Sequence, residues 1–364
     1  MRQTTPRQSI SNLAYATNDN RMAKRTLESF YKTVTPPKSK KLKADEELSA
    51  PISYTHHPSY PHPIASLPPS LTSALDNLSQ AQSKSITNQP HLNLLYFHPL
   101  LPSPAARELF QFLRRELPFY RVQYSIKRGG QTTQINTPRF TTVFGIDATA
   151  EFAPASATGS DVTPDALIPV DSKTRKPIPS TKYQYRPRPI PECLDKLRQS
   201  VEAAIGDGST YNFCLVNYYA TGDDSISYHS DDERFLGPNP SIASISLGAQ
   251  RDFLMRHKPS QAPGVSNQPL KFSLASGDMV VMRGETQSNW LHSIPKRKGG
   301  EAHKGRINIT FRKAVVPGGT NNYYNYNVGS GIVYRWDEGE GKMCPQSAVK
   351  AEEGESREPE GPVE

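Results

Sequence analysis

Three side chains in the second half of the chain are of the types that bind a metal ion. His229 and Asp231 stand two residues apart at the end of an expected strand, and His292 lies on another expected strand. Because residues two apart on a strand face the same side, the imidazole and the carboxylate can converge on one ion. Two histidines and one carboxylate leave half of an octahedron open, as in non-haem Fe(II) oxygenases, although Zn(II) can bind the same trio.

A second feature is the strand expected at Arg306–Arg312, where polar and apolar residues alternate. Its polar face carries Arg306, Asn308, Thr310 and Arg312, and its other face carries Ile307, Ile309 and Phe311. Two guanidinium groups directed into a protein interior are costly unless they meet an anion there. A guanidinium pairs bidentately with a carboxylate, so the polar face predicts a ligand with carboxylates at its ends. The alternative is an ordinary exposed strand face with both arginines in solvent.

The elements that must hold these side chains are mostly strands. We expect a helix over Ser103–Glu116, capped by Ser103 with Pro104 at its first position, and a second helix from about Pro191. A hairpin over residues 120–135 turns at Gly129-Gly130. Short strands with Gly, Pro and Asn between them predict an α+β, mainly β protein with a sandwich or jelly-roll core. The strands are expected at residues 94–97, 213–219, 225–229, 241–247, 251–256, 270–274, 278–282, 290–294 and 306–312.

Composition divides the chain into an expected ordered domain and two expected disordered tails. Of the 364 residues, 33 are Pro and 23 are Gly, and only 35% are hydrophobic, so part of the chain should stay unfolded. We expect residues 1–89 to be disordered and order to begin near Leu92. The ordered domain covers residues 90–316 with a surface insertion at 148–180, and an extension follows at 317–336. Residues 337–364, with nine acidic and three basic side chains, form an acidic disordered tail.

Charge and cysteine usage narrow the class of protein further. The net charge is +8 although the tail is acidic, which favours a polyanionic partner for the remaining chain. No run of about 18 apolar residues is present, so we expect no membrane span. The three cysteines are too far apart in sequence for a disulfide framework or a zinc site, which favours a reducing, intracellular location.

Several of these segments together resemble the AlkB family of Fe(II)/2-oxoglutarate dioxygenases, and most of all its eukaryotic DNA-repair branch. The resemblance covers roughly residues 92–316, and the ordered set of motifs is far more specific than any one of them. The segments that carry it are Asn217-Tyr218-Tyr219, Gly222, residues 229–233, residues 241–248, Arg251-Asp252-Phe253, His292 and Arg306–Arg312.

The resemblance implies a double-stranded β-helix flanked by two N-terminal helices, with His229, Asp231 and His292 as ligands of Fe(II). It also implies that Arg306 and Arg312 hold the carboxylates of 2-oxoglutarate, helped by Asn217, Tyr219 and Asn308. With O2 as the other cosubstrate, similar enzymes hydroxylate an N-methyl group on a base such as 1-methyladenine or 3-methylcytosine. The repaired base, formaldehyde, succinate and CO2 are the products.

A methylated ring nitrogen lies inside the duplex, so its nucleotide must be extruded and held between flat surfaces. Tyr183 and Tyr185 precede the second helix and are candidates for stacking on the base, the alternative being ordinary core aromatics. Asp232 and Glu233 are candidate acceptors for exocyclic amines, the alternative being that either is a solvated surface residue. The basic side chains between residues 121 and 139, Arg139 among them, would contact phosphate. The basic clusters at residues 256–258 and 296–298 would do the same, although any of these groups is alternatively a solvated charge patch.

A segment ahead of the expected domain resembles the motif that docks on sliding clamps of replication. In residues 24–31 an aliphatic residue is followed, three and four positions later, by two aromatic ones, Leu27, Phe30 and Tyr31, although Lys24 stands where Gln is usual. A transient amphipathic turn is the alternative. The basic run at residues 36–43 indicates a nuclear address or a nucleic-acid contact, so we expect a nuclear protein. We also expect it to be a monomer.

The leading hypothesis is therefore a DNA demethylase that uses Fe(II), 2-oxoglutarate and O2. One alternative keeps this chemistry but acts on RNA, on N6-methyladenine or on a protein. Another is a non-catalytic adaptor that binds damaged DNA and a clamp, which would need neither the metal ligands nor the arginines.

Overall fold

The computed structural model describes residues 52–158, 167–260 and 268–346. These residues belong to one compact unit, and the clamp-docking segment and the basic run lie outside them. None of the helices in this part of the chain is long and apolar enough to cross a bilayer.

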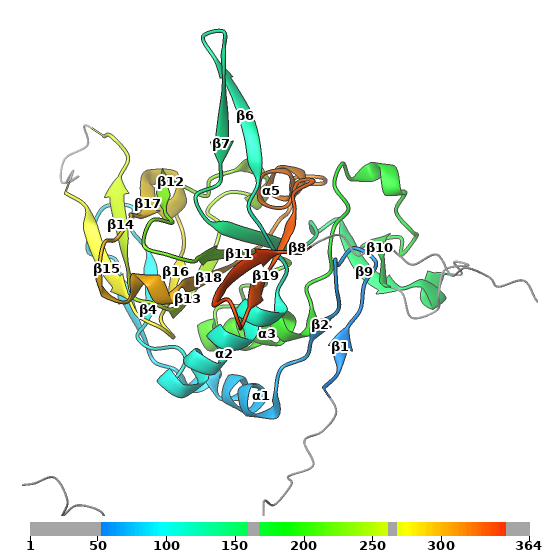
Figure 1. Ribbon diagram of the computed structural model, residues 1–364, viewed down its shortest axis with the longest axis horizontal. Coiled ribbons are helices and arrows are strands. Elements are labelled where there is room, and N and C mark those ends of the chain that lie inside the picture. The colour runs from blue at the N-terminus through cyan, green and yellow to red at the C-terminus, as the bar shows by residue number, and fades with distance from the viewer. Residues whose placement is uncertain (1–51, 159–166, 261–267, 347–364) are drawn as a thin grey trace, which may run out of the picture. The chain divides into compact units, whose positions relative to one another are not determined.

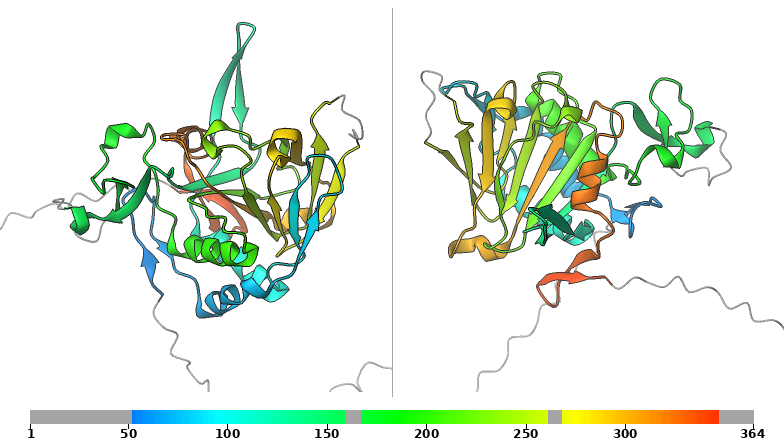
Figure 2. Two further views of the ribbon diagram at one scale, coloured as in Figure 1. Left: turned by 180° about the vertical axis from the view of Figure 1, so that it is seen from behind. Right: turned by 90° about the horizontal axis from the view of Figure 1, so that it is seen from above.

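Two antiparallel sheets packed face to face form the core (Figures 1 and 2). The smaller sheet contains, in spatial order, β12 (Ile226–His229), β17 (Trp290–Ile294), β14 (Arg251–His257) and β15 (Leu270–Leu274). The larger sheet contains β20 (Lys342–Pro345), β19 (Val333–Asp337), β5 (Phe119–Tyr120), β8 (Phe140–Gly145), β11 (Phe213–Tyr219), β18 (Arg306–Arg312), β13 (Ile242–Gly248), β16 (Met279–Met282), β4 (Leu94–Phe97) and β3 (Ser83–Ile86).

Strand β18 lies at the centre of the larger sheet, between β11 and β13, and every one of its residues is buried. Its apolar residues Ile307, Ile309 and Phe311 pack in the core on the helical side of the sheet. Its polar residues face the space between the two sheets, because side chains alternate along a strand. The predicted mainly β, jelly-roll architecture is confirmed, and with it the expected bounds of this strand.

Helices α1 (Pro69–Asp76), α2 (Ser103–Glu116) and α3 (Glu192–Ile205) cover the outer face of the larger sheet (Figure 1). The apolar stripe of α2, including Leu109 and Leu113, is fully buried against this face. The predicted bounds of α2 are confirmed, but the predicted cap is wrong. Pro102 is the N-cap residue, no side chain caps the first turn, and Ser103 is already helical.

A long hairpin, β6 (Gln123–Arg128) and β7 (Gln131–Asn136), stands out from the body of the domain in Figures 1 and 2. Arg128 pairs with Gln131, which leaves Gly129 and Gly130 as a two-residue turn. Both glycines have positive φ, 56° and 80°, as such tight hairpin turns require. The predicted hairpin and its turn are confirmed.

Order begins much earlier than residue 92, so the predicted limit of the N-terminal disorder is wrong for residues 52–89. Helix α1 buries Leu71 and Leu75 in the main core, and β3 extends the larger sheet. A small hairpin, β1 (Tyr54–Thr55) and β2 (Ile64–Ala65), precedes them. The region is polar in composition, so its few buried apolar residues, such as Leu71 and Leu75, gave no recognisable pattern in the sequence.

The C-terminal boundaries also need correction. Helix α5 (Asn321–Asn327) follows the core, and β19 then pairs with β5 at the edge of the larger sheet. Strand β20 pairs with β19 as far as Pro345, so the part of the expected acidic tail that the structure describes is folded. The insertion at 148–180 contains a hairpin of its own, β9 (Ala150–Pro154) and β10 (Leu167–Asp171).

Candidate active site

The pairing of β12 with β17 brings the two predicted metal-binding histidines together. His229 is directly opposite His292 in the register, and their ring centroids are 4.2 Å apart. Asp231 follows β12 and is fixed by α4 (Thr286–Asn289), where the Gln287 side-chain oxygen accepts a 2.9 Å hydrogen bond from the Asp231 backbone N–H. The closeness of the three ligand atoms, which all lie within 4.8 Å of one another, is that of a metal-binding set.

The ring nitrogens that face the carboxylate are the Nε2 atoms, 3.9 Å from Asp231 Oδ1 for His229 and 4.0 Å from Oδ2 for His292. The Nδ1 atom of His229 lies 2.9 Å from the Ser227 carbonyl oxygen, which can only accept. The proton therefore sits on Nδ1, and the Nε2 lone pair of His229 is free to bind a metal.

Electrostatics hold the other two ligands in the protonation states that a metal requires. Burial opposes ionisation of Asp231, but Arg312, with Nη2 2.8 Å from Oδ2, and then the histidines hold the pKa of this carboxyl well below its usual range. Burial, reinforced by His229, lowers the pKa of His292 to about 3. At neutral pH the site therefore offers a carboxylate and a neutral imidazole.

Arg306 is the most unusual charged group in the pocket. Its side chain is 1% exposed, and it donates one hydrogen bond of 2.8 Å, from Nη2 to the Ser246 hydroxyl. Its Nε and Nη1 atoms are buried without a hydrogen-bond partner among the described residues. Burial lowers the pKa of Arg306 to about 10, so the group remains a cation with donors to spare. Such a guanidinium fits a carboxylate ligand.

Arg312 was expected to bind a carboxylate of 2-oxoglutarate, but most of its hydrogen-bond donors already have partners within the protein. Its Nη1 donates to the Thr310 hydroxyl at 2.8 Å and its Nη2 to Asp231, so only Nε lacks a partner in the described part of the chain. Arg312 thus fixes Asp231, a candidate metal ligand, while Arg306 has more donors left for a ligand. The predicted contacts of both with 2-oxoglutarate stay predictions.

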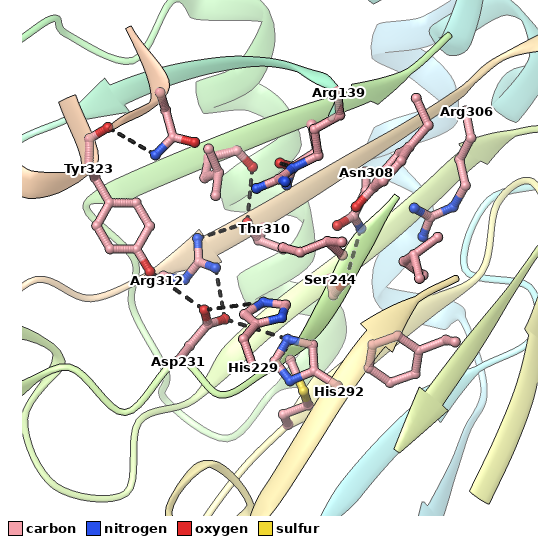
Figure 3. Close-up of a pocket in the computed structure, with 18 of the residues that line it drawn as sticks. Arg139, His229, Asp231, Ser244, His292, Arg306, Asn308, Thr310, Arg312 and Tyr323 are labelled. Atoms are coloured by element: carbon pink, nitrogen blue, oxygen red, sulfur yellow. Dashed lines mark hydrogen bonds and ion pairs between the residues drawn. The ribbon is translucent and has the colours of Figure 1, made fainter. Parts of the chain in front are cut away.

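A cavity of about 130 Å³ lies between the sheets and contains this whole arrangement (Figure 3). Within it, Asn217 Oδ1 accepts a 2.6 Å hydrogen bond from Arg139 Nε, and Asn308 Nδ2 donates to the Ser244 hydroxyl at 2.9 Å. The predicted residues that line the cavity are Arg139, Asn217, Tyr219, His229, Asp231, Glu233, His292, Arg306, Asn308 and Arg312.

The other predicted substrate residues lie outside this cavity. Tyr183 is buried, with its hydroxyl donating to Asp147 at 2.9 Å, which favours the core alternative. Tyr185 lines a second pocket at the root of the β6–β7 hairpin and donates a hydrogen bond to Asn325. Asp232 points to the surface, 2.7 Å from the Lys258 ammonium group. Among the described residues, the side-chain partners of these three are therefore not His229, Asp231 or His292.

One residue that the sequence did not indicate reaches the site from α5. The Tyr323 hydroxyl lies 3.0 Å from Glu233. It also lies 3.5 Å from Asp231, a contact that Figure 3 shows. Its segment, rich in Asn and Tyr, has no period from which a helix or a site could be inferred. Gln287 was not predicted either, because α4 is a single helical turn and is too short to produce a period in the sequence.

Comparison with known proteins agrees with this geometry. The family model described as the 2OG-Fe(II) oxygenase superfamily matches residues 93–312. The human protein named DNA oxidative demethylase ALKBH2 is 40% identical over 132 residues, which are 36% of this chain and 49% of that protein. Its Arabidopsis thaliana counterpart is 37% identical over 141 residues, 34% of this chain and 43% of its own length.

The human protein named alpha-ketoglutarate-dependent dioxygenase alkB homolog 3 is 41% identical over 144 residues, 37% of this chain and 48% of its own length. The chain thus matches about half the length of these relatives. The solved structure of OsALKBH1 is 17% identical, with a TM-score of 0.35, over 60% of this chain and 97% of that one. The chain belongs to the 2OG-Fe(II) oxygenase superfamily, and the AlkB-like character expected from its motifs is confirmed.

Proposed function

We propose that the protein is an oxidative demethylase that uses Fe(II), 2-oxoglutarate and O2 to repair N-methylated bases in DNA. The observation that carries the proposal is the convergence, in one cavity, of the His229, Asp231 and His292 ligands with the half-paired, buried guanidinium of Arg306. The names of the relatives, DNA oxidative demethylase and alpha-ketoglutarate-dependent dioxygenase, support the same substrate and cosubstrate.

In this mechanism the protein holds groups in position and excludes water. His229, Asp231 and His292 would bind the iron, and Arg312 would keep Asp231 ionised and oriented. Arg306 would pair with a carboxylate of 2-oxoglutarate, since its free donors are buried beside the metal site. When bound, the iron and 2-oxoglutarate supply the oxidising power that puts one atom of O2 on the N-methyl carbon and the other in succinate. The hydroxymethyl group then leaves the base as formaldehyde.

Exposed basic side chains of the domain support a nucleic-acid partner. Three exposed basic side chains are available for phosphate contacts: Lys296, Lys298 and Arg256. The Arg256 guanidinium lies over the Tyr228 ring, 4.4 Å from its centroid. Of the expected basic clusters, His257 is buried and Lys258 is paired with Asp232, so these two contribute less. Binding that depends on phosphate contacts weakens steeply as salt rises.

A turnover assay tests the proposed reaction. Oligonucleotides with 1-methyladenine or 3-methylcytosine should release formaldehyde only when Fe(II) and 2-oxoglutarate are present. A parallel panel of RNA, N6-methyladenine DNA and methylated peptide separates the alternatives that share this chemistry. His229→Ala should abolish the release; a cellular effect on alkylation survival that persists in this variant would instead favour a non-catalytic adaptor.

We further propose that Leu27, Phe30 and Tyr31 dock the protein on a replication clamp and that it works as a monomer in the nucleus. The sequence pattern of residues 24–31 supports the docking, and the basic run at residues 36–43 supports the nuclear location. The triple substitution of these three residues by Ala should abolish binding of the full chain to a purified clamp without lowering turnover. Equal binding by wild type and variant refutes the docking role.

A further inference from the structure

Tyr323 enters the pocket from a segment that the family match does not include. It lies on α5, beyond residue 312, where the match ends. Its ring is held on three sides: it packs edge-on against Phe213 and Phe235, at centroid distances of 5.4 and 5.3 Å, and the Arg312 guanidinium lies 5.3 Å from its centroid. Because the ring is confined in this way, the position of its hydroxyl is fixed.

That hydroxyl donates a 3.0 Å hydrogen bond to Oε1 of Glu233. Glu233 lines the mouth of the cavity, where its side chain would otherwise rotate freely in contact with solvent. With Oε1 engaged, the other carboxylate oxygen remains to accept a hydrogen bond from a ligand. The contact of the same hydroxyl with Asp231 is longer, 3.5 Å, and therefore weak.

An oriented acceptor at the mouth of the pocket distinguishes bases by their exocyclic group. Cytosine and adenine carry an amine, which donates, whereas thymine carries a carbonyl oxygen at the same place, which repels a carboxylate. We infer that Tyr323 is a positioning residue that orients Glu233 and thereby selects N-methylated bases with an exocyclic amine over those with a carbonyl. This inference rests on the proposed function and adds its substrate preference.

The experiment compares oligonucleotides that carry a single 3-methylcytosine or a single 3-methylthymine. The variants are Tyr323→Phe, which removes only the hydroxyl, Glu233→Gln, and the double variant. Tyr326→Phe is the matched control, since it removes a hydroxyl from the same helix on a side chain that is 48% exposed. Two readouts are taken for each: kcat/KM from formaldehyde release, and Kd from fluorescence anisotropy with protein loaded with Mn(II) and 2-oxoglutarate.

Tyr323→Phe should lower the preference for 3-methylcytosine about fivefold, the size expected for one hydrogen bond, and leave the KM for 2-oxoglutarate unchanged. The double variant should prefer 3-methylcytosine as strongly as Glu233→Gln does. The reason is that Tyr323 acts through Glu233, so removing its hydroxyl has no further effect once Glu233 is replaced. An equal loss on both bases would mean that Tyr323 acts through Asp231 and overturns the inference, as does an unchanged preference.

The two proposals fail in different ways. Wild-type protein that demethylates neither oligonucleotide contradicts the proposed function, whereas active wild type with an unchanged preference in Tyr323→Phe contradicts only the role of Tyr323. If turnover is absent, the binding preference still decides, measured as the Kd for the 3-methylthymine oligonucleotide divided by the Kd for the 3-methylcytosine oligonucleotide. A lower value of this ratio in Tyr323→Phe than in wild type supports the positioning role, and the same value in both refutes it.

Discussion

Replacing Arg306 with Met should stabilise the protein and at the same time remove its response to 2-oxoglutarate. Arg306 is fully buried with two nitrogens lacking partners among the described residues. Each unsatisfied buried donor costs about 1–3 kcal/mol, and the lost hydrogen bond to Ser246 offsets about half of the total. We therefore expect the free energy of unfolding to rise by about 2 kcal/mol, or Tm by about 4 °C in a domain of this size.

Arg251 provides a matched control for this substitution. It is equally buried, and its guanidinium lies 5.6 Å from the Tyr219 ring, against 5.3 Å for Arg306. It donates to the carbonyl oxygens of Thr221, Asp224 and Pro295 at 3.3, 2.8 and 2.6 Å. Arg251→Met leaves these buried carbonyl groups without their donors, so Tm should fall where that of Arg306→Met rises.

The assay is thermal unfolding with Mn(II), with and without 2-oxoglutarate. At a ligand concentration of about 100 times Kd, the wild type should gain about 2.7 kcal/mol, and Arg306→Met should gain almost nothing. A lower Tm for Arg306→Met without ligand would refute the reasoning about its unpaired donors. A full response of this variant to 2-oxoglutarate would refute its assignment to the ligand carboxylate.

Three further substitutions test other contacts of the structure. Arg312→Met leaves the Asp231 carboxylate buried without its cation and should cost about 3–5 kcal/mol in metal-free protein, partly restored by Mn(II) in thermal unfolding. Because burial and His229 lower the pKa of His292 to about 3, the unfolded chain binds a proton near pH 6.5 that the folded chain excludes. Stability of metal-free protein should therefore fall as pH falls from 6.5 towards 4, by up to about 1.4 kcal/mol per pH unit, and urea unfolding should show a smaller slope for His292→Leu. Leu71→Ala should cost about 2–5 kcal/mol in the same assay, and an unchanged midpoint would contradict the docking of α1 in the core.

The periodicity of apolar residues predicted the elements at the centre of the fold, because in these elements the apolar residues are the buried ones. Strand β18 shows this most clearly: its alternation predicted both its bounds and its polar face, and every residue of the strand is buried between helices and the smaller sheet. The helix α2 was predictable for the same reason, since its apolar stripe meets one continuous surface. The metal-binding set followed from spacing along β12, together with a histidine on its neighbour β17.

The margins of the domain were not predictable, because their contacts are few and distant in sequence. Helix α1 is attached by Leu71 and Leu75 within a polar region that resembles a disordered tail. Strand β19 is defined by pairing with β5, more than 200 residues earlier, and not by any alternation of its own. Tyr183 was ambiguous because a tyrosine suits both a core and a stacking surface, and only its hydrogen bond to Asp147 distinguishes the two.

The edge pairing of β19 with β5 has a practical consequence for anyone who trims this protein by homology. A fragment limited to residues 93–312 would contain the candidate metal ligands and both arginines. It would lack the residues of α5 that line the cavity, and strands β19 and β20, which follow α5. Such a fragment would expose the apolar edge of β5 to aggregation and leave Glu233 unrestrained. Weak or unselective turnover by a shortened version would then reflect where the chain was cut rather than the chemistry of the intact protein.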